Sequence, residues 1–208
     1  MSIERALTIP QREGEMARPR EFDEVTALEA AIDCFWRRGY EATSVRDLAK
    51  KMGISAPSLY NTYGDKHALF MQALERYLDH STRARIKRLE DSLPPKQAIR
   101  RFIDEIIERS VNDRERRGCF LINSALEVAP HDRKLGALIA DRLAEIEAFF
   151  YRSIKAAQAE GAVPKDRVAK DVARLLLGVL LGIRVLARSK PERSLLEGVA
   201  RPAFALLD

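Results

Sequence analysis

Apolar residues recur at intervals of three and four along most of the chain, and no stretch alternates apolar and polar residues for long enough to predict a strand. The first such series predicts an amphipathic helix over residues 21–38. Its apolar positions are Phe22, Val25, Leu28, Ile32, Phe35 and Trp36. Acidic residues lie in its first turn, and Arg37, Arg38 and Gly39 close it. The pattern predicts an all-α fold.

Two short helices follow, over residues 44–52 and 55–63. Ser44 and Asp47 have the spacing of a capping box, and Ser55 is suited to cap the second helix. A glycine turn of about three residues joins the two helices, and the longer helix before them braces the pair. This order is typical of a helix-turn-helix.

The rest of the chain predicts longer helices that are separated by proline and glycine. Their expected ranges are 66–91, 95–112, 118–129, 132–160, 166–188 and 191–207. We therefore divide the chain into an N-terminal arm (1–20), a helix-turn-helix domain (21–66) and a second helical domain (67–208).

Charge changes the picture mainly through its position. The net charge of +5 and the pI of about 9.3 permit a polyanionic partner without requiring one. The basic residues near the two short helices outnumber the acidic ones; they are Arg37, Arg38, Arg46, Lys50, Lys51 and Lys66. This distribution favours nucleic-acid binding there. We interpret Lys50 and Lys51 as a solvated face, and the arm 1–20 as a solvated tail or as a basic segment for a minor groove.

The sequence shows no features of an enzyme, a membrane protein or a secreted protein. No histidines have metal-ligand spacing, and there is no nucleophile elbow and no glycine loop for phosphate, so we expect neither an enzyme nor a cofactor. The longest apolar run, residues 175–183, is too short to span a bilayer. The N-terminal residues lack the apolar core of a secretion signal, so we expect a cytoplasmic protein with reduced Cys34 and Cys119.

The segment from Gly39 to Phe70, GYEATSVRDLAKKMGISAPSLYNTYGDKHALF, resembles the DNA-binding domain of the TetR/AcrR family of bacterial regulators. The resemblance implies a homodimer that binds double-stranded operator DNA and is released by an unknown small-molecule inducer bound in residues 67–208. It further implies a transcriptional regulator, with repression as the expected role. The alternative is a helical interaction protein whose helix-turn-helix no longer binds DNA.

The same resemblance assigns roles to single residues. It places Arg46, Ala56 and Pro57 near base edges. It places Thr43, Ser44, Ser58, Tyr60, Thr62 and Lys66 on phosphates. Arginine can pair with guanine, and hydroxyls and lysine hold phosphate oxygens, so the residue types agree. Ala56 departs from members with a long polar side chain at this position, which leaves Arg46 and DNA shape to carry specificity. Tyr60 is alternatively a core aromatic, as we expect of Tyr63.

The predicted helix 166–188 is apolar around more of its circumference than one core face requires. The resemblance implies that it and helix 191–207 pair with their two-fold mates in a dimer. Gly178 and Gly182 would permit close approach there, and a crowded core within one subunit is the alternative. Pro202 is expected to kink or shorten the last helix.

Apolar residues of the middle helices are candidates for the wall of a ligand site, although an ordinary core needs the same residues. The candidates are Phe102, Ile106, Cys119, Phe120, Asn123, Phe149 and Phe150. Cys119 follows several arginines at a predicted helix N-terminus, a setting that favours a reactive thiolate. It is therefore either a thiol sensor or a small buried residue, whereas Cys34 is expected not to react.

Overall fold

The computed structural model describes residues 23–208, and in this range the regular structure is entirely helical. The all-α prediction is confirmed. The predicted arm 1–20 and the first two residues of the predicted first helix lie outside the described residues. The helices are α1 (Glu24–Arg38), α2 (Val45–Met52), α3 (Ala56–Tyr63), α4 (Lys66–Leu78), η1 (Asp79–Arg83), α5 (Ala84–Ser92), α6 (Pro95–Asn112), α7 (Phe120–Glu127), α8 (Arg133–Ala159), α9 (Ala169–Ser189) and α10 (Arg193–Ala205).

Local capping fixes the first three helices. Asp23 caps α1, so this helix begins at residue 24, and the predicted start near residue 21 lies outside the described residues. Ser44 and Asp47 form the predicted capping box of α2, and Gly53 ends it with a left-handed conformation that suits glycine. Ser55 accepts a hydrogen bond from the backbone amide of residue 58 and starts α3. These local contacts position the helix-turn-helix.

The predicted single helix 66–91 is a chain of three elements. A π-helical segment, η1, separates α4 from α5. In this region the Ser81 hydroxyl donates to the carbonyl oxygen of Tyr77 at 2.6 Å. The spacing of apolar residues does not reveal a π-helical segment, so the sequence predicted one continuous helix. Such segments are often found at functional sites.

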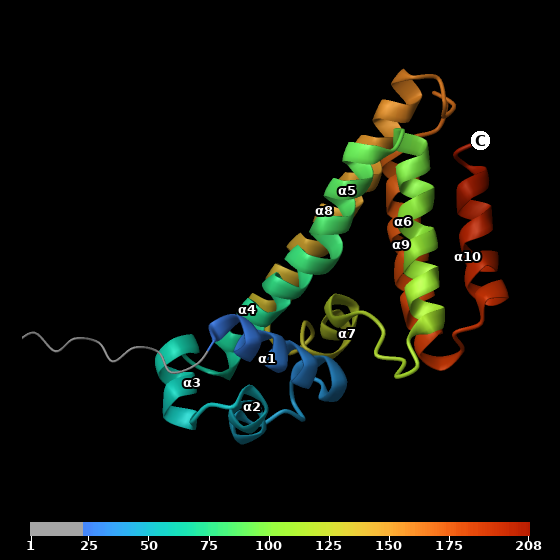
Figure 1. Cartoon of the computed structure of the whole chain (residues 1–208). Coiled ribbons are helices and arrows are strands. Elements are labelled where there is room, and N and C mark those ends of the chain that lie inside the picture. The colour runs from blue at the N-terminus through green and yellow to red at the C-terminus, as the bar shows by residue number, and fades with distance from the viewer. Residues whose placement is uncertain (1–22) are drawn as a thin grey trace, which may run out of the picture.

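The C-terminal helices form a bundle in which α8 packs on α9 and α6, and α10 packs on α9 and α6. Figure 1 shows α2 and α3 at one end of the molecule, with α7 between that end and the bundle. Helix α10 continues through Pro202 to residue 205, so proline does not shorten it. None of the helices in residues 23–208 combines the length and apolar character that a membrane crossing requires.

Candidate nucleic-acid interface and ligand pocket

The exposed side of α2 and α3 carries side chains that have few partners within residues 23–208. Arg46 is exposed, and within residues 23–208 it makes no hydrogen bond or ion pair. Pro57 is exposed at the start of α3, and Tyr60 is 51% exposed on the same helix. We call Arg46, Pro57 and Tyr60 the reading surface. Leu59 and Tyr63 point into the core instead, and the Tyr63 hydroxyl donates to the carbonyl oxygen of residue 24. The core assignment of Tyr63 is confirmed.

The other predicted DNA contacts differ in how exposed they are and in whether their side chains already have partners. Ser44 and Ser58 are partly engaged, since their hydroxyls bond to Asp47 and Ser55 respectively. Ala56 and Thr62 are half-buried. The ammonium group of Lys66 lies over the ring of Tyr40, 4.2 Å from its centroid, and stays at the start of α4.

Thr43 is a correction to the sequence prediction. Its side chain is fully buried, and its hydroxyl donates to the carbonyl oxygen of Gly39 at 2.6 Å. A hydroxyl held in this way closes the turn between α1 and α2 and is not presented to a phosphate. We therefore leave Thr43 out of the proposed contacts.

Neighbouring basic residues are paired with acids. Lys51 lies 3.3 Å from the carboxylate of Asp33, and Arg38 lies 3.2 Å from that of Asp47. Lys50 is exposed on the same side of α2. These surface pairs contribute little to stability, but they reduce the charge that Arg38 and Lys51 offer to a polyanion.

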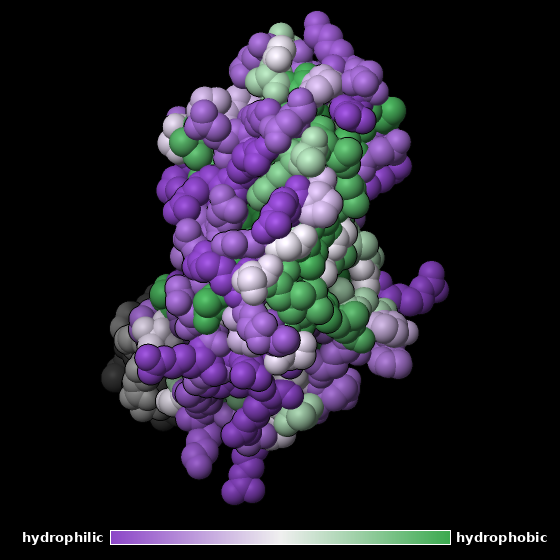
Figure 2. Space-filling model, turned by 90° about the vertical axis from the view of Figure 1, so that its right-hand side faces the viewer, coloured by the Kyte–Doolittle hydropathy of each residue, from purple (hydrophilic) through white to green (hydrophobic). Residues whose placement is uncertain are grey.

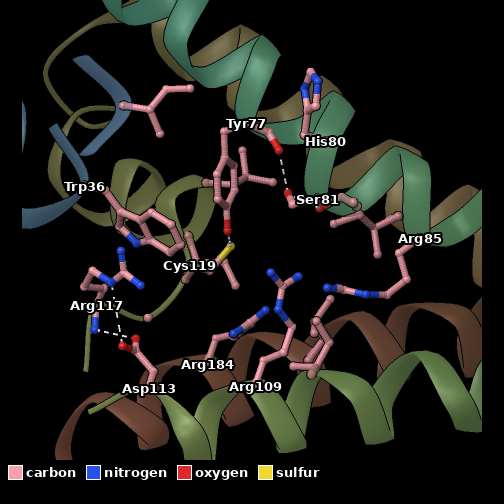
Figure 3. Close-up of a pocket in the computed structure, with 18 of the residues that line it drawn as sticks. Trp36, Tyr77, His80, Ser81, Arg85, Arg109, Asp113, Arg117, Cys119 and Arg184 are labelled. Carbon is pink, nitrogen blue, oxygen red and sulfur yellow. Dashed lines mark hydrogen bonds and ion pairs between the residues drawn. The ribbon is translucent and has the colours of Figure 1, made fainter. Parts of the chain in front are cut away.

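A cavity of about 270 Å³ lies between α1, the α4–η1–α5 helix, α6, α7 and α9 (Figure 3). Phe102, Ile106 and Cys119 line it, as predicted for a ligand wall. Its volume is near the lower end of the range of roughly 300–1,000 Å³ that is usual for small-molecule sites.

The remaining predicted wall residues lie elsewhere. Phe149 and Phe150 are fully buried and pack on Phe102, with ring centroids 5.2 and 5.6 Å away from it. They belong to the core behind the wall. Phe120 and Asn123 line a second cavity of about 360 Å³ beside α1. Their assignment to one common pocket with Phe102 is wrong, because a residue pattern does not tell which side of a helix meets which neighbour.

Cys119 is the N-cap residue of α7 and is 9% exposed at the cavity wall. The hydroxyl of Tyr77 donates to its sulfur at 3.7 Å (Figure 3). Burial raises the pKa of Tyr77, so the tyrosine remains a donor at neutral pH. Cys34 is buried in α1, and burial raises the pKa of its thiol, which disfavours the reactive thiolate.

Sequence reasoning missed the basic residues of the cavity. Arg85, Arg109 and Arg184 come from α5, α6 and α9 and converge inside it (Figure 3); we call them the arginine cluster. Arg85 and Arg184 are only 6% and 9% exposed. One signal was present: Arg184 continues the buried stripe of Leu176 and Leu180 at helical spacing, where a surface charge is not expected.

Helices α7 and α8 connect the cavity region to the helix-turn-helix. The Glu127 carboxylate, at the end of α7, accepts a hydrogen bond from the backbone amide of Glu41 at 3.0 Å. A Cβ at Gly39 would come within 2.6 Å of the same carboxylate, and Gly39 has a positive φ of 86°. At the start of α4, His67 Nε2 lies 3.0 Å from the carboxylate of Asp132, which caps α8.

An apolar strip runs over the side of the molecule on which α10 lies (Figure 2). Leu175 and Val185 of α9 are 44% and 47% exposed. At Gly178 and Gly182, no atom of another element lies within 4 Å of the place a Cβ would take. The alternative in which these glycines fill a crowded core of one subunit is therefore wrong. Contiguous apolar surface of this kind commonly marks an interface.

Within residues 23–208, no group of three or more histidine, cysteine, aspartate or glutamate side chains is arranged to hold a metal ion. The side chains that could hold a ligand in the cavity are therefore the cationic and apolar ones.

Two family models match the chain. Residues 27–73 match the bacterial regulatory proteins of the tetR family, and residues 95–201 match the tetracyclin repressor-like C-terminal domain. The chain is 32% identical to YezE of Bacillus subtilis, an uncharacterised HTH-type transcriptional regulator, over 93% of this chain and 100% of that protein. It is 28% identical to the HTH-type transcriptional repressor ComR of Escherichia coli, over 82% of each chain.

Among solved structures, the fold is similar to that of the TetR family transcriptional regulator CifR. A cysteine mutant of CifR in complex with 26-bp double-strand operator DNA is 31% identical, with a TM-score of 0.82, and the match covers 91% of this chain and 98% of that one. These matches confirm the expectation of a regulator and not an enzyme. The chain belongs to the TetR family of bacterial regulatory proteins.

Proposed function

We propose that the chain is a transcriptional repressor that binds a pseudo-palindromic operator as a homodimer and is released by a small molecule or by thiol modification. One observation carries the proposal. The reading surface is exposed and free of partners within residues 23–208, in a fold that resembles CifR, a regulator solved on operator DNA. The similarity to ComR, a repressor, supports repression over activation.

The proposed contacts follow from the geometry of α2 and α3. A recognition helix offers its N-terminal side chains to the major groove, so Ala56 and Pro57 would meet base edges and Arg46 would reach a guanine from α2. Ser44, Ser58, Tyr60, Thr62 and Lys66 would hold phosphate oxygens.

The test is selection of bound fragments from the source genome, followed by a gel shift at moderate salt. An operator enriched over random DNA supports the proposal. Absence of any enriched fragment favours the alternative of a helical interaction protein, which the exposed α2 and α3 would also permit.

The proposed dimer uses α9 and α10. Leu175 and Val185 are exposed large apolar side chains, and Gly178 and Gly182 leave room for another helix. A two-fold axis there would set two reading surfaces about one helical turn of DNA apart, or a multiple of it.

Release is proposed to begin at the cavity. A ligand there would contact α4, α6, α7 and α9 together. Helix α7 holds the helix-turn-helix through Glu127, and α4, which follows α3 in the chain, is tied to α8 through His67 and Asp132. A shift of these helices would change the spacing of the two reading surfaces.

Cys119 is the residue proposed for release by thiol modification, because its sulfur lies at the cavity wall. With 1,4-benzoquinone, the sulfur would bond to a ring carbon. The thiol proton would pass to one quinone oxygen and the hydrogen of the attacked carbon to the other, which gives a hydroquinone thioether. We expect quinone to release operator from the parent and from Cys34→Ser but not from Cys119→Ser, as measured by fluorescence anisotropy. Release that survives Cys119→Ser would leave Cys119 as packing and direct the search to a non-covalent ligand.

A further inference from the structure

The cavity contains more positive than negative side chains. Five arginines and two carboxylates line it: Arg76, Arg85, Arg109, Arg117, Arg184, Glu29 and Asp113. Arg76 is paired with Glu29 at 2.6 Å. Arg117 lies 3.6 Å from Asp113, 3.2 Å from Glu115 and 4.5 Å from the ring centroid of Trp36. Both carboxylates are therefore used by these two arginines.

The arginine cluster is left with little negative charge. Arg184 donates to the hydroxyl of Ser110 at 3.2 Å, a neutral partner. Arg85 lies 3.2 Å from Glu105, but that carboxylate also pairs with Arg88 at 2.7 Å and Arg101 at 3.1 Å. Arg109 is exposed and makes no hydrogen bond or ion pair in the described part of the chain, so the cost of burial falls on Arg85 and Arg184. Of the three guanidinium groups, only that of Arg85 therefore has an acidic partner within residues 23–208, and it shares that carboxylate with Arg88 and Arg101.

Such an arrangement is costly without an anion. Burying a charge is unfavourable unless it is paired, and like charges that converge repel one another. Burial lowers the pKa of Arg85 to about 10, and repulsion from Arg109 and Arg184 contributes to the change. The Arg85 guanidinium therefore remains charged at neutral pH, beside two further guanidinium groups that have no acidic partner within residues 23–208.

Part of the cavity wall is apolar. Phe102, Ile106, Ile146 and Leu180 line the same cavity, and the Arg85 guanidinium lies 5.7 Å from the ring centroid of Phe102. An inorganic anion would satisfy the arginines and leave this wall uncovered. An anion with an apolar body covers both.

We propose that the effector of this protein is a small organic carboxylate, whose anionic head is held by Arg85, Arg109 and Arg184 and whose apolar body lies against Phe102 and Ile106. This inference rests on the proposed function and names the ligand class of its cavity. Arginine is suited to the role because its planar fork binds carboxylate oxygens in pairs.

The test is isothermal titration calorimetry of the full chain, without DNA. The probes are benzoate, phenylacetate, hexanoate and decanoate, each paired with its neutral amide, and inorganic phosphate is the control for a bare anion. We expect at least one carboxylate to bind at least about tenfold more tightly than both its amide and phosphate. Amides that bind as tightly as their acids, phosphate that binds as tightly, or no binding by any of the four carboxylates would overturn the proposal.

Variants of the cluster separate binding from folding. Arg184→Met and Arg109→Gln should each weaken the binding carboxylate by at least about tenfold. Arg184→Met should also leave the Tm of the free protein unchanged or higher, because it removes a buried charge that lacks an acidic partner. Arg174→Gln, an exposed arginine on the same helix, should change neither quantity. A lower Tm with unchanged affinity would show that Arg184 is only structural.

The same carboxylate is then added to the protein on its selected operator. Release supports both proposals. A carboxylate that binds the protein without releasing the operator would support the ligand class and contradict its role as effector. A protein that binds no operator would contradict the proposed function, and the calorimetry would still decide the ligand class.

Discussion

The reading surface and the arginine cluster are both cationic, but they hold their charge in opposite ways. Arg46 is exposed, where water solvates it at little cost. Arg85 and Arg184 are buried, where an unpaired charge is costly. The first arrangement suits a long polyanion that binds through many weak, salt-dependent contacts. The second suits a small anion that fits a pocket of limited volume. Because the two sites do not overlap, any competition between their ligands has to pass through the helices that join them.

The largest effect is expected where both regions depend on the dimer. Gly178→Glu places a charged side chain in the apolar strip, so we expect monomers and complete loss of operator binding together, because one reading surface alone covers only a half-site. Sedimentation and anisotropy measure the two effects. Ala156→Glu, on an exposed position of α8, is the matched control and should behave like the parent. A monomeric parent that binds a full operator would contradict the dimer.

The reading surface is tested next by Arg46→Ala. We expect a loss of roughly 1–3 kcal/mol of operator binding and relaxed preference at one base pair, because a bidentate contact with guanine is lost. Competition anisotropy with single-base operator variants measures both. Lys50→Ala removes an exposed charge from the same helix and serves as the control. Equal losses in the two variants would mean that Arg46 acts only as a charge.

The connection between the regions is tested by Glu127→Ala. Glu127 holds the backbone amide of Glu41, so its removal should reduce the effect of a cavity ligand on operator affinity by about 0.5–2 kcal/mol. The affinity is measured with and without saturating carboxylate, as identified by calorimetry. Ligand affinity without DNA should stay unchanged. Full coupling in Glu127→Ala would remove this contact from the pathway.

Lys66→Ala is expected to have the smallest effect. A phosphate contact carries no sequence information, so operator and random DNA should be weakened alike, and the slope of log affinity against log salt should fall by about 1. Lys66 also lies over Tyr40, so thermal melting should confirm that the fold is retained. A loss confined to the operator would assign Lys66 to base recognition.

Prediction from sequence succeeded where structure is local. Ser44, Asp47 and Ser55 act within three residues of their own positions, so the pattern alone locates the starts of α2 and α3. Thr43 was misassigned because its hydroxyl is used by a backbone carbonyl four residues earlier, inside the turn.

The cavity was predictable only in part, since it is assembled by helices that are distant in sequence. Phe102 and Phe149 are both phenylalanines on the apolar faces of their helices. Phe102 lines the cavity, whereas Phe149 is buried in the core behind it. His80, Ser81 and Thr82 of the π-helical segment line the cavity, and no pattern of apolar residues predicted this. Arg85 and Arg109 resemble ordinary surface charges until the three helices are brought together, and only Arg184, in line with Leu176 and Leu180, breaks an apolar pattern.

The central claim is that this protein is a dimeric operator-binding regulator whose reading surface lies on α2 and α3. The most direct measurement is an anisotropy titration of a fragment selected from the source genome, with parent and Arg46→Ala protein, across a salt series. The account predicts saturation at one dimer, or a whole number of dimers, per fragment, affinity that falls linearly on a log–log plot with salt, and weaker binding by Arg46→Ala. Binding of the selected fragment that is no tighter than binding of random DNA, and that Arg46→Ala leaves unchanged, would contradict it.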